Sequence, residues 1–93
     1  NSDKEAEFRR SFTAFYPNYI PALHRLSPDI TRTDELIAML IILELSSDEI
    51  GLTLGISRIG VNKARSRMRK RLGLDSDAKL EDFLKGIWDS PYS

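Results

Sequence analysis

Apolar side chains recur along this chain at spacings of three and four residues, which places them on one face of an α-helix. Phe8, Phe12 and Phe15 follow this spacing near the N-terminus, and residues 36–43 carry an apolar stripe so wide that other helices should surround it. No segment shows the apolar–polar alternation of a half-buried β-strand. The sequence therefore predicts an all-α fold.

Capping signals divide the chain into six expected helices. Ser46 and Glu49 have the spacing of a capping box, and Gly55 and Gly73 are suited to end two of the helices. The expected N-terminal caps are Asn18, Thr31 or Thr33, Ser46 or Ser47, Ser57 and Asp77, and the helices should end near residues 16, 26, 44, 55, 72 and 87. Leu23 and Leu26 should face the core, and residues 88–93 should form a tail.

A chain of 93 residues makes one domain, in which we expect packing or linker helices at 1–26 and a helix-turn-helix unit at 27–93. It has no cysteine, which excludes disulfides and thiolate zinc sites and suits the cytoplasm. The longest apolar run, residues 36–43, is far shorter than a membrane span. Because the chain starts within a charged, helix-like segment, we expect a C-terminal piece of a larger protein, whose upstream part could hold a membrane anchor.

Positive charge is concentrated in one segment. Residues 58–71 include seven Lys or Arg and no Asp or Glu, although the net charge of the chain is zero. A solvated helix face would be the simpler explanation, but such faces normally mix signs because acid–base pairs four residues apart stabilise a helix. A localised cationic helix is typical of a protein that binds nucleic acid, and we expect a location at the nucleoid.

On a helical wheel this segment separates into a buried stripe, an outer face and two flanks. The stripe holds Val61, Ala64, Met68 and Leu72; the outer face holds Ile59, Lys63, Ser66 and Lys70, with Asn62 beside them; the flanks hold Arg65 with Arg69 and Arg67 with Arg71. A helix that reads the DNA major groove needs polar groups outward for base edges and cations on its flanks for the two phosphate walls.

A short helix precedes this segment, and the turn between them fits helix-turn-helix geometry. Gly55 permits the sharp reversal, Ile56 would fill the angle between the helices, and Ser57 would cap the second one. Gly51, in the middle of the first helix, indicates close approach by another helix.

The segments LSSDEI at 45–50, LGIS at 54–57 and MRKRLGL at 68–74, together with Val61, resemble the LuxR-type helix-turn-helix domain, the DNA-binding output domain of many bacterial transcriptional regulators. The resemblance covers about residues 26–87, with a weaker match at Ile30, Thr31, Asp34 and Glu35. It implies four helices, of which the third reads the major groove and the fourth often makes a dimer. The alternate arginines also resemble a subgroup in which a sensor of tandem helical repeats and a helical linker precede this domain.

The resemblance also implies roles for single residues. It implies base contacts for Asn62, Lys63 and Ser66. It places Ser57, Gly60, Arg67 and Lys70 near phosphates, and the charge pattern adds Arg58, Arg65, Arg69 and Arg71. Gly60 stands where the family usually has threonine and Ala64 where it usually has histidine, so two customary contacts to the DNA backbone are missing. We therefore expect the arginines to carry more of the affinity than usual and the salt dependence to be steep.

The indicated function is sequence-specific binding of double-stranded DNA by a bacterial transcriptional regulator, with the helix at about 58–72 in the major groove. Two alternatives stay open: a promoter-reading domain of the sigma-factor type, which would also contact RNA polymerase, and a helical protein-interaction module with a basic face. We expect a homodimer through the last or the N-terminal helix, and neither catalysis nor a cofactor or metal. The single histidine, His24, has no acidic cluster near it in the sequence, and no nucleophile motif is present.

Overall fold

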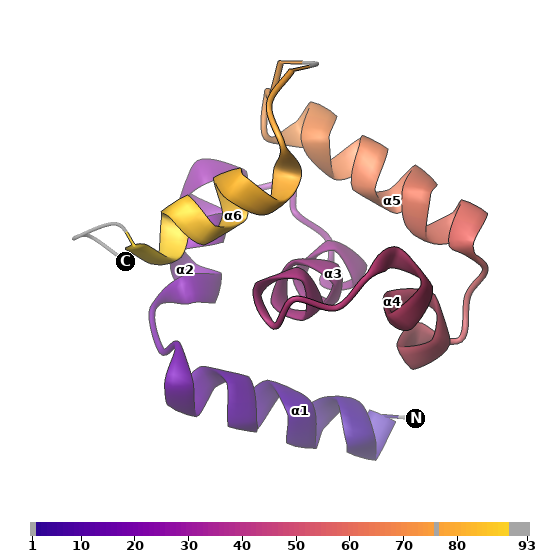
Figure 1. The fold of residues 1–93 in the computed structure, drawn as a ribbon. Helices are drawn as coiled ribbons and strands as arrows, with labels where there is room; N and C mark the ends of the chain where they lie inside the picture. The colour runs from indigo at the N-terminus through magenta and orange to yellow at the C-terminus, as the bar shows by residue number, and fades with distance from the viewer. Residues whose placement is uncertain (1, 76, 90–93) are drawn as a thin grey trace.

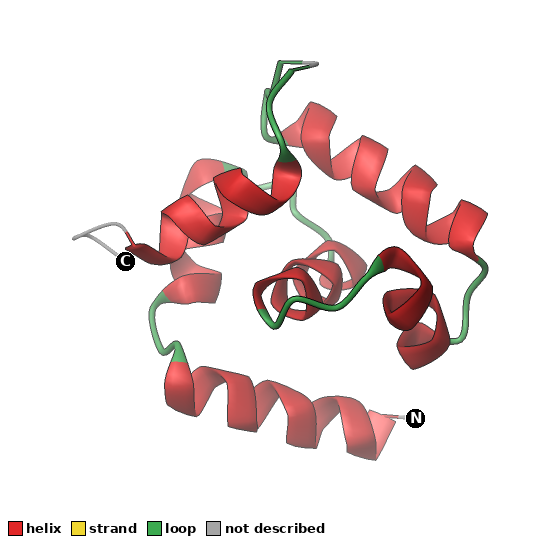
Figure 2. Ribbon diagram, viewed as in Figure 1, coloured by secondary structure: helices red, strands yellow, loops and turns green. Residues whose placement is uncertain are grey.

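The computed structural model describes residues 2–75 and 77–89, and these contain helices and loops but no strand (Figures 1 and 2). The all-α prediction is confirmed. The helices are α1 (Ser2–Phe15), α2 (Tyr19–Leu26), α3 (Arg32–Ile42), α4 (Ser47–Leu54), α5 (Arg58–Arg71) and α6 (Leu80–Asp89).

Helix α3 occupies the middle of the molecule, with α1 and α5 on opposite sides of it (Figure 1). All six residues from 37 to 42 are buried, so this helix is covered on every side in its second half, as its wide apolar stripe predicts. Leu43, which follows the helix, is 43% exposed and lies outside the core. The other helices each contribute one apolar face to the same core.

Side chains cap three of the helices at their N-termini. Thr31 and Ser46 each accept a hydrogen bond from the backbone N–H three residues on, and the carboxylates of Asp34 and Glu49 accept one in return, which makes two complete capping boxes. Ser57 accepts from the N–H of Gly60 at 3.0 Å. Asn18 occupies the cap position of α2 but makes no side-chain capping hydrogen bond.

Three helices end in the same way, at a residue in the left-handed conformation. The sequence predicts a left-handed cap at Gly55 and the end of a helix at Gly73, and their φ angles are +71° and +69°. The third is Glu44, with φ +68°, and the N–H of Leu45 donates across it to the carbonyl of Leu40. The prediction that α3 extends to Glu44 is therefore wrong, because the chain reverses there and the helix ends at Ile42.

The predicted start of the last helix is also wrong. Helix α6 begins at Leu80 rather than after Asp77, because the guanidinium of Arg69 donates to the carbonyls of Asp75 and Ala78 and holds this segment in a turn. Residues 88 and 89 belong to α6 rather than to a tail, and residues 90–93 lie outside the described part.

The N-terminal helices pack into the common core. The ring of Phe12 is buried and lies 4.7 Å from that of Tyr16 and 5.7 Å from that of Tyr19, between centroids. The prediction that Phe15 and Leu26 face the core is wrong. Phe15, the last residue of α1, is 78% exposed, and Leu26, the last residue of α2, is 57% exposed.

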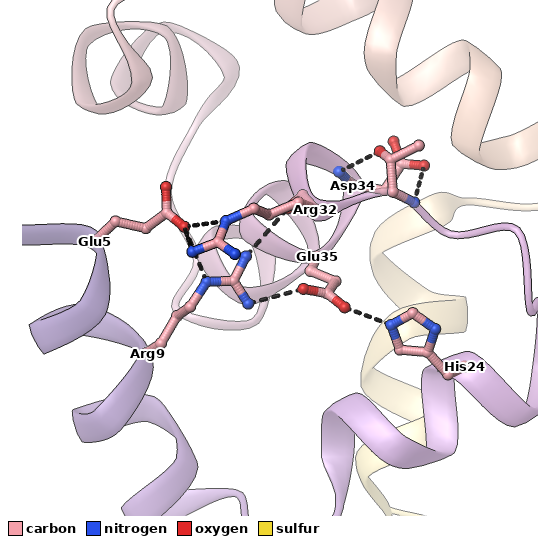
Figure 3. A network of polar contacts seen from close by, with 7 residues as sticks. Glu5, Arg9, His24, Arg32, Asp34 and Glu35 are labelled. Atoms are coloured by element: carbon pink, nitrogen blue, oxygen red, sulfur yellow. Dashed lines mark hydrogen bonds and ion pairs between the residues drawn. The ribbon is translucent and has the colours of Figure 1, made fainter. Parts of the chain in front are cut away.

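A network of charged side chains fastens α1 and α2 to the first turn of α3 (Figure 3). Glu5 accepts from Arg9 and Arg32, and Glu35 accepts from Arg9 at 2.7 Å. His24 makes a short hydrogen bond to Glu35, which gives this half-exposed histidine a structural role. Burial would raise the pKa of Glu35, but hydrogen bonds with His24 and Arg9 outweigh it and hold the pKa below its ordinary value.

Candidate nucleic-acid interface

The turn between α4 and α5 is closed by backbone contact at Gly51. The N–H of Ile56 donates to the carbonyl of Gly51 at 2.9 Å, and a Cβ on Gly51 would lie 2.8 Å from the carbonyl oxygen of Ile56 and 3.5 Å from a methyl group of Val61. The expected close approach by another helix is made chiefly by the backbone of the turn, and α5 adds an ordinary contact through Val61. The side chain of Ile56 stays 40% exposed, so the backbone of this residue, more than its side chain, joins the two helices.

Helix α5 presents the predicted stripe to the core. Val61, Ala64 and Met68 are buried, and Leu72 is half-buried against them. This orientation leaves the opposite face of α5 in solvent, and the exposed residues there include all three predicted base-reading side chains, Asn62, Lys63 and Ser66. The structure therefore places these three on one accessible face of one helix.

Two arginines of α5 form ion pairs with acidic residues far along the chain. Arg71 binds the buried carboxylate of Asp34 at 2.5 Å, and Arg65 binds Glu81 at 2.7 Å with its own side chain only 17% exposed. Burial would raise the pKa of Glu81, but hydrogen bonds from its own backbone N–H and from Arg65 hold the pKa below its ordinary value. These pairs fasten the last two turns of α5 to α3 and α6.

Two further arginines of the cationic segment also bind within the chain. Arg69 donates to the carbonyls of Asp75 and Ala78, as described above for the start of α6. Arg58 lies 3.6 Å from Asp48, but both side chains are more than 60% exposed, so this pair adds little stability and leaves Arg58 accessible.

The three remaining cations of α5 are Lys63, Arg67 and Lys70. Each is exposed, and within residues 2–75 and 77–89 the side chain of none of them forms a hydrogen bond or an ion pair. The cationic segment therefore contains two groups of side chains: those that bind the protein itself and those that face solvent. The sequence contained a signal for this division, because Asp34 and Glu81 lie in the first turns of neighbouring helices, but it did not show which arginine each would meet.

Ser57 and Gly60 form the N-terminal turn of α5. The Ser57 hydroxyl accepts from the N–H of Gly60; Ser57 is exposed and Gly60 is half-buried. The predicted phosphate contacts thus fall into an accessible group (Ser57, Arg58, Gly60, Arg67 and Lys70) and a group held by the protein (Arg65, Arg69 and Arg71).

No helix in the described part of the chain combines the length and the apolar character needed to span a membrane. In comparisons with known proteins, no family model, no curated protein and no solved structure matches this chain.

Proposed function

We propose that this domain binds double-stranded DNA in a sequence-specific manner, with α5 in the major groove, as the output domain of a bacterial transcriptional regulator of the LuxR type. The observation that carries the proposal is the exposed face of α5, where Lys63, Arg67 and Lys70 have no acidic partner among the described residues while polar side chains lie between them. A helix of this kind, capped and set at a fixed angle by the turn before it, suits the width of the major groove.

The division of the cations assigns separate roles within this proposal. Asn62, Lys63 and Ser66 meet base edges, whereas Arg67, Lys70 and the accessible Arg58 neutralise phosphates. Arg65, Arg69 and Arg71 hold α5 at its angle to the core through their contacts with Glu81, the turn at 75–78 and Asp34. Binding should therefore depend less steeply on salt concentration than it would if all seven cations of α5 contacted phosphates.

The neighbouring cations Arg69 and Lys70 provide a direct test. Each phosphate that a lysine or arginine neutralises releases bound cations from the DNA, and this steepens the slope of log binding constant against log salt concentration by about 0.9. We expect Lys70→Ala to reduce the slope by about 0.9 with little change in stability, because the side chain of Lys70 binds no described residue. Arg69→Ala should leave the slope nearly unchanged and lower the unfolding midpoint, because it removes two hydrogen bonds that hold the 75–78 turn.

Fluorescence anisotropy with a duplex selected from a random pool would measure both quantities over a salt series. Arg10→Ala is the matched control, since it removes an exposed cation from α1, on the far side of α3 (Figure 1). It should change neither slope nor affinity. Duplex binding that shows no salt dependence, or that survives loss of Lys63, Arg67 and Lys70 together, would contradict the proposal and favour a basic surface for an acidic protein.

A homodimer forms part of the proposal, because paired domains would place two α5 helices in half-sites about one helical turn apart. The apolar face of α6 is not available for a dimer contact, because Leu80, Leu84 and Ile87 are buried in the core. Phe15 remains exposed at the end of α1 and is the better candidate. Sedimentation of the wild type and of Phe15→Ser, each with and without the selected duplex, would test it.

A further inference from the structure

Ile59 has a large apolar side chain that does not pack into the core of the protein. It is 68% exposed and belongs neither to the buried core nor to the half-buried apolar residues packed against it. Isoleucine is also a poorer helix former than the charged residues around it, because its branched side chain is restricted in a helix. Burial and helix stability therefore give no reason for isoleucine at this position.

The surroundings of Ile59 indicate what covers it. It is the second residue of α5 and, at about 100° per residue, lies within roughly 40° of Lys63, Ser66 and Lys70 around the helix axis. It thus lies at the N-terminal end of the exposed polar face, and in helix-turn-helix proteins the N-terminal residues of the recognition helix approach the base edges. A surface that meets these cations must carry negative charge and offer an apolar group between its charges.

The adjacent Gly60 is a second observation at the same turn. A Cβ at Gly60 would lie 3.5 Å from the Ser57 hydroxyl and 3.7 Å from the Ile56 Cβ, which are ordinary contacts, and its φ is not in the left-handed region. The fold would accept alanine there, which would stabilise the helix by about 1 kcal/mol. A glycine that the fold does not require, beside an exposed isoleucine, suits close approach by an external surface.

We propose, resting on the DNA-binding function above, that Ile59 is a specificity-determining residue that contacts the 5-methyl group of a thymine in the major groove. Among the four bases only thymine presents an apolar group there, and aliphatic or aromatic side chains recognise it by contact. Ile59 supplies the apolar contact, and Lys63 and Ser66 supply the polar contacts on the same face.

Uracil lacks only the methyl group of thymine, so replacing thymines one at a time in the selected duplex isolates this contact. For the wild-type chain, at least one thymine-to-uracil change should weaken binding about fourfold, as expected for loss of one buried methyl group. Ile59→Ala should weaken binding to the thymine duplex to a similar or greater extent and should bind the thymine and uracil duplexes equally. Because the side chain is exposed, the variant should fold normally, and circular dichroism will verify this.

Leu52→Ala is the matched control, because it removes an exposed aliphatic side chain from α4 and should keep the preference for thymine. Wild-type tolerance of uracil at every position, or an unchanged preference in Ile59→Ala, would overturn the assignment of Ile59 while leaving DNA binding intact. Absence of salt-dependent duplex binding by the wild type would instead overturn the proposed function, and the assignment with it. An Ile59→Ala variant that binds every duplex like the wild type would place Ile59 against a protein partner.

Discussion

Replacing Gly51 with alanine tests how tightly the turn between α4 and α5 is closed. In an exposed helix interior this substitution normally stabilises a protein by about 1 kcal/mol, because alanine loses less backbone entropy. Here the added Cβ would lie 2.8 Å from the carbonyl oxygen of Ile56, which is a backbone atom and cannot rotate away. The turn, and with it the start of α5, must shift to admit the methyl group.

The size of the effect follows from these two opposing contributions. Ordinary contact begins at 3.4 Å, so the contact is too short by roughly half an ångström at a point where Ile56 is also held by its hydrogen bond to the Gly51 carbonyl. Overpacking of this kind costs about 1–3 kcal/mol. After the gain of about 1 kcal/mol in helix propensity, we expect a net loss of up to about 2 kcal/mol. A loss of 1 kcal/mol lowers the melting temperature of a domain this size by about 4–8 °C.

Urea unfolding followed by far-ultraviolet circular dichroism will measure this loss, and Gly86→Ala provides the matched control. Gly86 also lies inside a helix, but a Cβ there would meet nothing within 4 Å, so its replacement should stabilise the domain by about 0.5–1 kcal/mol. The two variants should therefore change stability in opposite directions. Equal stabilisation by both would refute the close approach of the turn to α4 and the account of Gly51 that depends on it.

Three further predictions concern two buried polar residues, Tyr19 and Asp34, and the half-buried Glu35. Tyr19→Phe should raise stability by about 1 kcal/mol in thermal unfolding, because the buried Tyr19 hydroxyl has no hydrogen-bond partner among the described residues; a loss of stability would show that the hydroxyl is satisfied. Asp34→Ala should destabilise by about 2–4 kcal/mol in urea, since it removes a capping hydrogen bond and leaves Arg71 without its carboxylate; Thr33→Ala, an exposed neighbour, should have little effect. The pKa of Glu35 is lowered in the folded protein, so its contribution to stability should be complete above the ordinary value of about 4.5 and lost as the pH falls through the lowered value. Glu35→Gln should flatten this dependence below about pH 4.5, and a mutant with the same pH profile as the wild type would exclude that role for Glu35.

The features that were predictable from sequence are those fixed by residues close together in the chain. The capping box of Ser46 with Glu49, the left-handed Gly55 and Gly73, and the buried stripe of α5 each depend on spacings of five residues or fewer. The helical class follows from the same local patterns. The exposed face of α5 follows as well, because the buried stripe determines which residues lie opposite to it.

The features that were missed depend on residues far apart in the chain. Nothing within α3 predicts a left-handed Glu44, since this conformation is unusual for a residue other than glycine. Glu44 is held by the surrounding turn and by an ion pair with Lys85 of α6, whose Nζ lies 2.6 Å from the Glu44 carboxylate. The start of α6 depends on Arg69, and a capping serine, threonine or aspartate cannot reveal a turn held by an arginine from another helix. Phe15 fits its helical stripe by spacing, but α1 ends before any neighbouring element covers it.

The cations of α5 show most clearly why a charge count does not determine a binding surface. In the sequence all seven are equivalent, because no acidic residue lies among them. In the fold, Arg65 and Arg71 lie on opposite flanks of the helix. Arg65 pairs with Glu81 of α6 and Arg71 pairs with Asp34 of α3, so both arginines help to fix the orientation of α5. Binding to a phosphate would have to compete with a half-buried ion pair at either site. Under the proposed function, affinity for DNA would depend on the cations that face solvent, and the arginines that hold α5 in place would contribute by presenting that face at a fixed angle.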